Sequence, residues 1–315
     1  MSDDIILDIR NVTKRFPGVI ALNDVSIQIR RGEIHGLCGE NGAGKSTLMK
    51  ILSGVYPFGT YEGSIFYEGK ELNLGVGAIR QAREEGIAIV YQELTLVPNM
   101  TVGENVFLGK EPTENGSIDW SKLYADTRDI LARYRLDVSP QAVVKYLGVG
   151  KMQMVEIAKA LSENAKILIL DEPTSALTES EIDKLMEILE NLRSHGVTCI
   201  YITHKLDEFF RITDSVTILR DGKTVTTQPT KQLTQEKLVS YMVGREMKER
   251  FPRGHRQPGE VMFEVSELHA VDPNETSRSV LNGVTFNLRR GEILGIAGLM
   301  GSVTDLLQLG VRQRL

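Results

Sequence analysis

The chain has 315 residues, which is enough for two ordinary domains. Its 41% hydrophobic and 25% charged residues are typical of a globular protein, and a net charge of −5 disfavours nucleic acid as the main partner. Two cysteines, Cys38 and Cys199, are too few for a disulfide framework and favour a reducing compartment.

The first half of the chain alternates between strand and helix patterns. Residues 5–9 and 25–29 alternate apolar and polar side chains, which predicts two half-buried strands. GEIHGLCG, residues 32–39, predicts a strand that runs into a glycine-rich turn. KSTLMKILSG, residues 45–54, predicts a helix that ends at glycine, and GSIFYEGK, residues 63–70, predicts another strand and turn.

The next part of the chain begins with helices and returns to strands. Residues 120–162 have mostly helical spacing. KILILDEP, residues 166–173, is a continuous apolar run that predicts a strand buried on both faces. An amphipathic helix is predicted over 181–196, and two more strands over 197–204 and 215–222. This alternation predicts an α/β fold with a mainly parallel sheet.

Residues 39–47, GENGAGKST, fit the phosphate-binding pattern G-x-x-x-x-G-K-[ST] between a predicted strand and a predicted helix. The glycines let backbone N–H groups face phosphate oxygens, and the start of the helix adds its dipole. Lys45 can reach the β- and γ-phosphates, and the Ser46 hydroxyl can ligate Mg²⁺. The alternative is a flexible glycine turn that holds GKS by chance. The predicted nucleotide site consists of Gly39, Glu40, Asn41, Gly42, Ala43, Gly44, Lys45, Ser46 and Thr47.

Two adjacent carboxylates follow the buried strand predicted at 166–173. Asp171 can hold Mg²⁺ through water, and Glu172 can orient or deprotonate an attacking water. The alternative is that both residues only cap the turn with Pro173. With a phosphate loop upstream, the pair predicts hydrolysis of ATP as well as binding.

The order of these motifs resembles that of ATP-binding cassette (ABC) transporter ATPases. The resemblance covers residues 5–241 and implies a P-loop NTPase core with a mainly parallel sheet, an antiparallel β subdomain and a helical subdomain. Five motifs carry it: GENGAGKST, VYQEL at 90–94, LGVGKMQMVEIAKAL at 147–161, ILILDEPTSALT at 167–178 and YITHKLDE at 201–208.

The resemblance also implies roles for three further residues. Phe16 is expected to stack on adenine, although its simpler interpretation is a core aromatic. Gln92 is expected to contact Mg²⁺ and the attacking water and to sense a membrane subunit, where a surface glutamine is the alternative. His204 is expected to contact the γ-phosphate, where a structural histidine is the alternative.

Two segments depart from the family pattern. The signature segment of the family reads LSGGQ, whereas residues 147–151 read LGVGK. Gly148 therefore lacks the hydroxyl, Val149 adds bulk, and Lys151 replaces the glutamine. Thr178 stands where many relatives have the aspartate of SALD. Both departures predict a weak contribution to the ATP site of a partner domain.

Shorter stretches resemble the carbohydrate importers that carry two cassettes in one chain, among them the D-xylose importer ATPases. The cues include EGIAIVYQEL, TVGENVFLG, MVGRE and YPFGTYEG. This resemblance implies integral membrane permease subunits, a periplasmic sugar-binding protein and a position on the cytoplasmic face of the inner membrane. Two alternatives remain open: a soluble cassette ATPase that acts on ribosomes or DNA, and a remnant that binds nucleotide without turning over.

The chain begins a second copy of the same structure. Residues 1–241 are expected to form one ATPase domain, residues 242–259 a linker, and residues 260–315 the first part of a second, incomplete domain. The basis is that VLNGVTFNLRRGEILGIAGLMGS, residues 280–302, repeats residues 21–43 without a gap.

In this second copy Thr304 falls opposite Lys45 and Asp305 opposite Ser46, so a second phosphate loop is expected to lack its lysine. FEVSEL, VTFNLR and EILGIAG are predicted to be its strands. A second cassette or a second copy of the chain is the expected partner of the first domain. We expect the chain alone to be a poor ATPase.

Overall fold

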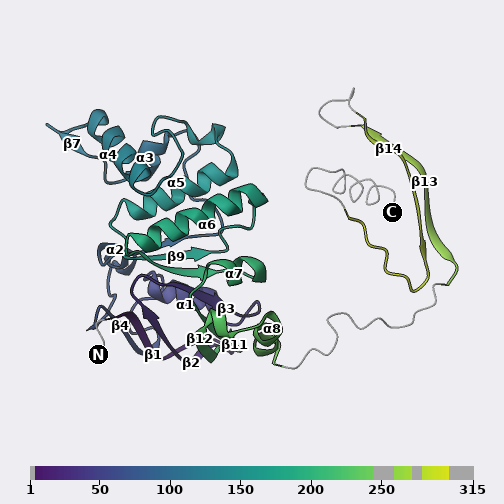
Figure 1. Ribbon diagram of the computed structural model, residues 1–315, viewed down its shortest axis with the longest axis horizontal. Helices are drawn as coiled ribbons and strands as arrows, with labels where there is room; N and C mark the ends of the chain where they lie inside the picture. The colour runs from purple at the N-terminus through teal and green to yellow at the C-terminus, as the bar shows by residue number, and fades with distance from the viewer. Residues whose placement is uncertain (1–3, 245–258, 272–278, 298–315) are drawn as a thin grey trace. The chain divides into compact units, whose positions relative to one another are not determined.

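A computed structural model describes residues 4–244, 259–271 and 279–297 (Figure 1). The chain divides into two compact units, residues 1–247 and 248–315, and each unit is described by itself. The expected linker lies mostly outside the described residues, as do Thr304 and Asp305. Within the described part of the chain, no helix is long and apolar enough to cross a bilayer.

A six-stranded sheet forms the centre of the first unit, in the order β12-β11-β3-β10-β9-β6. All neighbouring pairs are parallel except β11 and β12, which form an antiparallel hairpin. The prediction of a mainly parallel sheet is therefore confirmed. The strands are β3 (Ile34–Cys38), β6 (Ile87–Val90), β9 (Ile167–Asp171), β10 (Thr198–Ile202), β11 (Ser215–Arg220) and β12 (Lys223–Pro229).

The apolar run at the centre of the sheet is buried on both faces, as predicted. Residues 167–170 have no exposed surface. Leu168 and Leu170 pack into one core with helices α5 (Val149–Leu161) and α6 (Glu179–Ser194). Ile167 and Ile169 pack into the other core with α1 (Lys45–Leu52). Helices on both faces explain why this strand lacks alternation.

A second, antiparallel sheet of order β2-β1-β4-β5 packs into the core that contains Ile167 and Ile169. Its strands are β1 (Ile5–Phe16), β2 (Val19–Arg30), β4 (Glu62–Tyr67) and β5 (Lys70–Glu71). The first two are longer than the predicted 5–9 and 25–29. The pairing of Ile9 with Ile27 and of Val12 with Val25 leaves one extra residue in β1, a bulge in which Asn11 has a φ of 52°. Beyond the bulge, the positions whose side chains face the core are shifted by one residue along the sequence. The alternation of apolar and polar residues therefore ends before the strand does.

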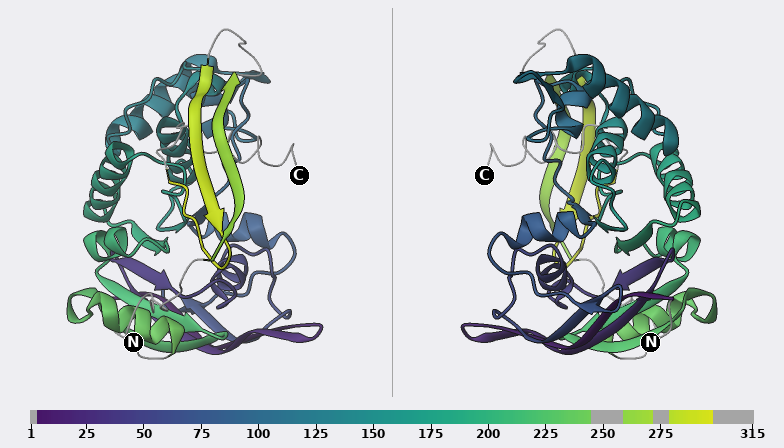
Figure 2. Two further views of the ribbon diagram at one scale, coloured as in Figure 1. Left: turned by 90° about the vertical axis from the view of Figure 1, so that its right-hand side faces the viewer. Right: turned by 90° about the vertical axis from the view of Figure 1, so that its left-hand side faces the viewer.

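The remaining elements form a helical region and short connections. Figure 2 shows the helical region at one end of the first unit and the long β1–β2 hairpin at the other. Both predicted subdomains are therefore present. The elements are α2 (Ala78–Glu84), α3 (Val102–Val106), β7 (Thr113–Glu114), β8 (Ser117–Ile118), α4 (Trp120–Arg133), η1 (Val144–Tyr146), α7 (Leu206–Ile212), η2 (Thr230–Gln232) and α8 (Gln235–Val243).

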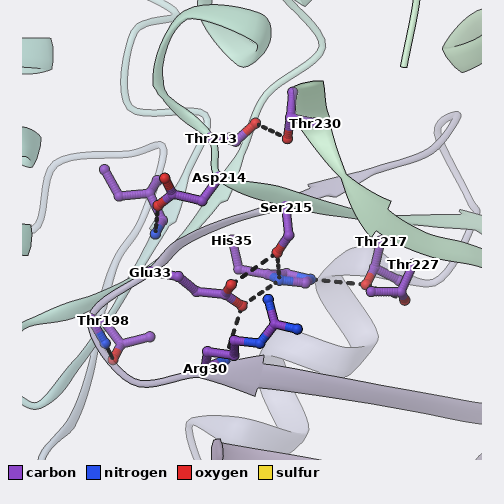
Figure 3. Close-up of polar contacts among 12 residues, drawn as sticks. Arg30, Glu33, His35, Thr198, Thr213, Asp214, Ser215, Thr217, Thr227 and Thr230 are labelled. Carbon is purple, nitrogen blue, oxygen red and sulfur yellow. Dashed lines mark hydrogen bonds and ion pairs between the residues drawn. The ribbon is translucent and has the colours of Figure 1, made fainter. Parts of the chain in front are cut away.

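A buried polar network joins β3 to the β11–β12 hairpin (Figure 3). His35 Nδ1 lies 3.0 Å from Glu33 Oε1 and 2.8 Å from Ser215 Oγ, and its Nε2 lies 2.8 Å from Thr217 Oγ1. The backbone N–H of Arg30 donates to the same Glu33 carboxylate at 2.9 Å. Burial alone raises the pKa of Glu33, but His35, the Arg30 amide and Ser215 together hold that pKa below its usual value.

Replacing Glu33 with Gln is expected to lower the free energy of unfolding at neutral pH by about 1–3 kcal/mol, because buried donors lose their charged acceptor. Since the folded-state pKa of Glu33 lies below the unfolded value, its contribution is complete above the ordinary carboxyl pKa. That contribution is lost as the pH falls through the folded-state value. Urea unfolding at several pH values should therefore show that the free energies of unfolding of the parent chain and of Glu33→Gln converge as the pH falls. The exposed Glu71→Gln serves as the control, and a gap that widens in acid would contradict the assignment.

The second unit contains an antiparallel pair, β13 (Val261–Val271) and β14 (Ser279–Arg289). The prediction of a strand over EILGIAG is wrong for its described residues 292–297, which have no regular structure. In the first unit the matching strand β3 pairs with β10 and β11. The described residues of the second unit provide no such neighbours, and Ile293 is 85% exposed. A lone strand cannot satisfy its backbone hydrogen bonds through pairing.

Candidate nucleotide site

The parallel sheet brings four loops to one edge, because the carboxyl ends of parallel strands meet there. Leu37 of β3 is level with Ile202 of β10, Ile202 with Asp171 of β9, and Leu170 with Val90 of β6. The loops that follow these strands carry the phosphate-loop residues, His204, Glu172 and Gln92 respectively.

The phosphate loop requires glycine at two of its positions. A Cβ atom at Gly39 would overlap the backbone oxygen of Leu219. Gly44 has a φ of 103°, and a Cβ atom there would lie 2.6 Å from the backbone oxygen of Ala21. Gly44 is also the N-cap of α1 and makes no side-chain cap, so the first N–H groups of the helix are free of a side-chain acceptor. This arrangement suits a phosphate group.

Lys45 begins α1 and folds back over the loop. Its Nζ donates to the backbone oxygens of Gly39 at 2.7 Å and Glu40 at 3.1 Å. These bonds hold the ammonium group above the loop, where a phosphate would be bound. Ser46 follows and is exposed, so its hydroxyl is accessible to a metal ion.

Asp171 and Glu172 occupy different environments at the end of β9. Burial and the charge of Glu172 raise the pKa of Asp171, and the charge of Lys45 opposes this shift. Glu172 has a φ of 48°, and its N–H donates to the backbone oxygen of Ile202 at 2.9 Å. Its Oε1 lies 3.2 Å from Nδ1 of His204. A carboxylate and an imidazole thus meet beside the phosphate loop.

Gln92 and Phe16 are the other two residues expected at the site. Gln92 follows β6 at the same edge of the sheet and is exposed. Phe16 ends β1 and is half-buried; its ring packs edge-on against Tyr56 with centroids 5.5 Å apart, and Lys14 Nζ lies 5.2 Å from the Phe16 centroid. The Phe16 ring is therefore held by its own aromatic cluster.

The residues at this edge of the sheet are suited to a Mg²⁺ ion that is coordinated mainly by the phosphates of a nucleotide. Among the described residues there is no group of three or more His, Cys, Asp or Glu side chains that could hold a metal. Mg²⁺ usually takes one or two protein ligands and completes its shell with water and phosphate oxygens. Ser46 and Asp171 are suited to that role.

The signature segment forms the start of α5. Gly148 is the N-cap and makes no side-chain cap, and Val149 begins the helix. Glu181 of α6 accepts a hydrogen bond from the N–H of Gly150 at 3.2 Å. The same carboxylate accepts from the N–H and the hydroxyl of Thr178, each at 2.9 Å.

Thr178 is therefore the N-cap of α6 and presents no carboxylate. Glu181 accepts hydrogen bonds from both segments that depart from the family pattern, residues 147–151 and Thr178. Sequence analysis missed Glu181. The capping-box spacing T-x-x-E at 178–181 is the signal that could have found it.

The parallel sheet carries the phosphate loop, the two carboxylates and His204 at one edge, which is the arrangement expected of a P-loop ATPase. Residues 22–175 match the family described as ABC transporter. The chain therefore contains an ABC transporter ATPase domain.

Individual proteins agree with this assignment. The chain is 57% identical over 297 residues to the xylose import ATP-binding protein XylG of Thermoanaerobacter pseudethanolicus, covering 94% of this chain and 58% of that protein. It is 48% identical over 310 residues to the L-arabinose transport ATP-binding protein AraG of Geobacillus stearothermophilus, covering 98% and 60%. The chain thus spans about three fifths of the length of these curated relatives.

A solved structure agrees on the fold. The dimeric post-hydrolysis state of the ATP-binding cassette MJ0796 bound to ADP and Pi superposes with a TM-score of 0.60 at 26% identity, covering 71% of this chain and 98% of that one.

Proposed function

We propose that this chain binds Mg-ATP and hydrolyses it to energise import of a carbohydrate, with D-xylose as the first candidate. The observation that carries the proposal is the meeting of Glu172 and His204, 3.2 Å apart, at the sheet edge that also carries the phosphate loop. The xylose and arabinose relatives support the substrate class.

Each site residue has a proposed role in this reaction. Lys45 and the backbone of residues 39–47 bind the phosphates, and Phe16 stacks on the adenine. Ser46, Asp171 and Gln92 hold Mg²⁺, which neutralises phosphate charge when bound. Glu172 accepts a proton from the attacking water, and His204 contacts the γ-phosphate and keeps Glu172 oriented.

The partners follow from the same proposal. Residues 1–241 are the ATPase domain, residues 242–259 the linker, and residues 260–315 the first part of a second domain. The ATP site is completed by that second cassette or by a second copy of the chain. Integral permease subunits hold the protein at the cytoplasmic face of the inner membrane, and a periplasmic binding protein delivers the sugar. A groove lined by the exposed Val55, Val76, Ile79 and Leu108 offers apolar side chains for contact with a permease subunit.

The test measures binding and turnover separately on the purified full chain. Calorimetric titration with Mg-ATP should give saturable binding to one site, and phosphate release should exceed that of a Lys45→Ala control. Binding without phosphate release would favour the non-cycling alternative. Reconstitution with the permease and the binding protein should then show which of D-xylose and L-arabinose stimulates turnover, and no stimulation by either would refute the sugar assignment.

A further inference from the structure

A buried carboxylate joins the loops after β9 and β10 at a second point, away from the contact between Glu172 and His204. Glu208 lies on α7, and its side chain is only 8% exposed. Thr174 and Tyr201 are 1% and 0% exposed. A charge buried to this extent is costly unless its oxygens are paired, so the contacts of Glu208 are informative.

Glu208 links three residues. Its Oε2 accepts hydrogen bonds from Thr174 Oγ1 at 2.7 Å and from the Tyr201 hydroxyl at 2.9 Å. Its Oε1 lies 3.1 Å from Lys205 Nζ, and that ammonium also donates to the backbone oxygen of Thr174 at 3.0 Å. Thr174 is therefore held through both its side chain and its backbone.

The tyrosine remains a donor in this network. Burial, together with the charge of Glu208, raises the pKa of Tyr201 well above its usual value. The hydroxyl therefore keeps its proton. Oε2 of Glu208 accepts two hydrogen bonds, whereas Oε1 accepts none among the described residues and has the Lys205 ammonium as its ion-pair partner. A buried network of this kind restrains its members, because loss of the Oε2 acceptor would leave the hydroxyl groups of Thr174 and Tyr201 unpaired.

We propose that Glu208 is a positioning residue for ATP hydrolysis. It ties Thr174 to Lys205 and thereby sets the separation between Glu172, two residues before Thr174, and His204, which precedes Lys205. This inference rests on the proposed function.

The two groups that act on the water and the phosphate need such a support. The side chains of Glu172 and His204 are 21% and 66% exposed, and one contact joins them. Misplacement of a reacting group by about 1 Å can cost on the order of 10²-fold in rate. The buried tie acts on the backbone segments that carry both groups, so its loss is expected to affect kcat more than nucleotide affinity.

The test uses substitutions of matched shape in the full chain. Thr174→Val keeps the volume and removes the hydroxyl, and it is expected to lower kcat by about tenfold or more with the Kd for Mg-ATP unchanged. Thr174→Ser restores the hydroxyl and should recover most of kcat. Thr127→Val is the control, because Thr127 of α4 is also 0% exposed and donates to the backbone oxygen of Leu123 at 2.7 Å. It should lose stability without losing kcat.

Hydrogen exchange gives a readout that does not require hydrolysis. In Glu208→Gln, amides of residues 203–206 should exchange faster than in the parent chain, while those of α4 should not change. Equal kcat in Thr174→Val and the parent, or an equal loss of kcat in Thr127→Val, would overturn the proposal. If the parent chain itself releases no phosphate, the proposed function fails, and unchanged exchange at residues 203–206 would then show separately that Glu208 does not hold the loops.

Discussion

Glu172→Gln is expected to reduce kcat for Mg-ATP by about 10²–10⁴-fold while leaving nucleotide binding nearly intact. The substitution keeps the shape of the side chain and removes the carboxylate that we propose accepts the water proton. The backbone bond from Glu172 N–H to Ile202 is unaffected by this change, so the loop should keep its place. Single-turnover phosphate release, with binding measured by calorimetry, separates the two effects.

The control for this variant is Glu187→Gln, which makes the same chemical change at an exposed position of α6. It should hydrolyse ATP at the parental rate. If Glu172→Gln also does so, the base is another group. If Glu172→Gln instead loses nucleotide affinity, the carboxylate contributes to binding and its assignment as the base is wrong.

Lys45→Ala is expected to weaken Mg-ATP binding by about tenfold or more, since a charge-assisted phosphate contact contributes about 1.5–3 kcal/mol. The effect has two physical sources. The ammonium group that we propose faces the phosphates is lost, and so are its bonds to Gly39 and Glu40, which order the loop. Calorimetric titration with Mg-ATP measures the change directly.

Lys50→Ala is the matched control, because Lys50 lies in the last turn of the same helix and is exposed. Its affinity for Mg-ATP should equal that of the parent chain. Lys45→Arg keeps the charge but changes its geometry, so an intermediate affinity is expected. If Lys45→Ala binds Mg-ATP as tightly as the parent chain, the assignment of the phosphate loop to the nucleotide site is wrong.

The phosphate loop and the buried strand β9 could be predicted from sequence because each depends on consecutive residues. In GENGAGKST the glycines, the lysine and the start of the helix follow one another, so the local chain already specifies the site. The run ILIL is apolar throughout, and its complete burial in the structure agrees with that pattern. Asp171 and Glu172 could be identified because they directly follow this run.

Other features depended on neighbours that are distant in sequence. The bulge at Asn11 extends β1 past the end of its alternating pattern, and residues 292–297 lack a strand although their sequence resembles that of β3. In both places the pairing partners decide the structure, because a strand is stable only when its backbone groups are paired.

The site shows the same division between local pattern and tertiary structure. Sequence analysis identified Glu172 and His204 separately, but only the parallel pairing of β9 and β10 brings them to 3.2 Å. Thr174 and Glu208 are 34 residues apart, and no sequence pattern indicated their contact. The amino-acid sequence by itself determined the phosphate-loop pattern at 39–47 and the carboxylate pair that follows the buried strand. The tertiary structure decided which of them meet, because the distance between side chains on different strands is set by the sheet register and by buried polar contacts.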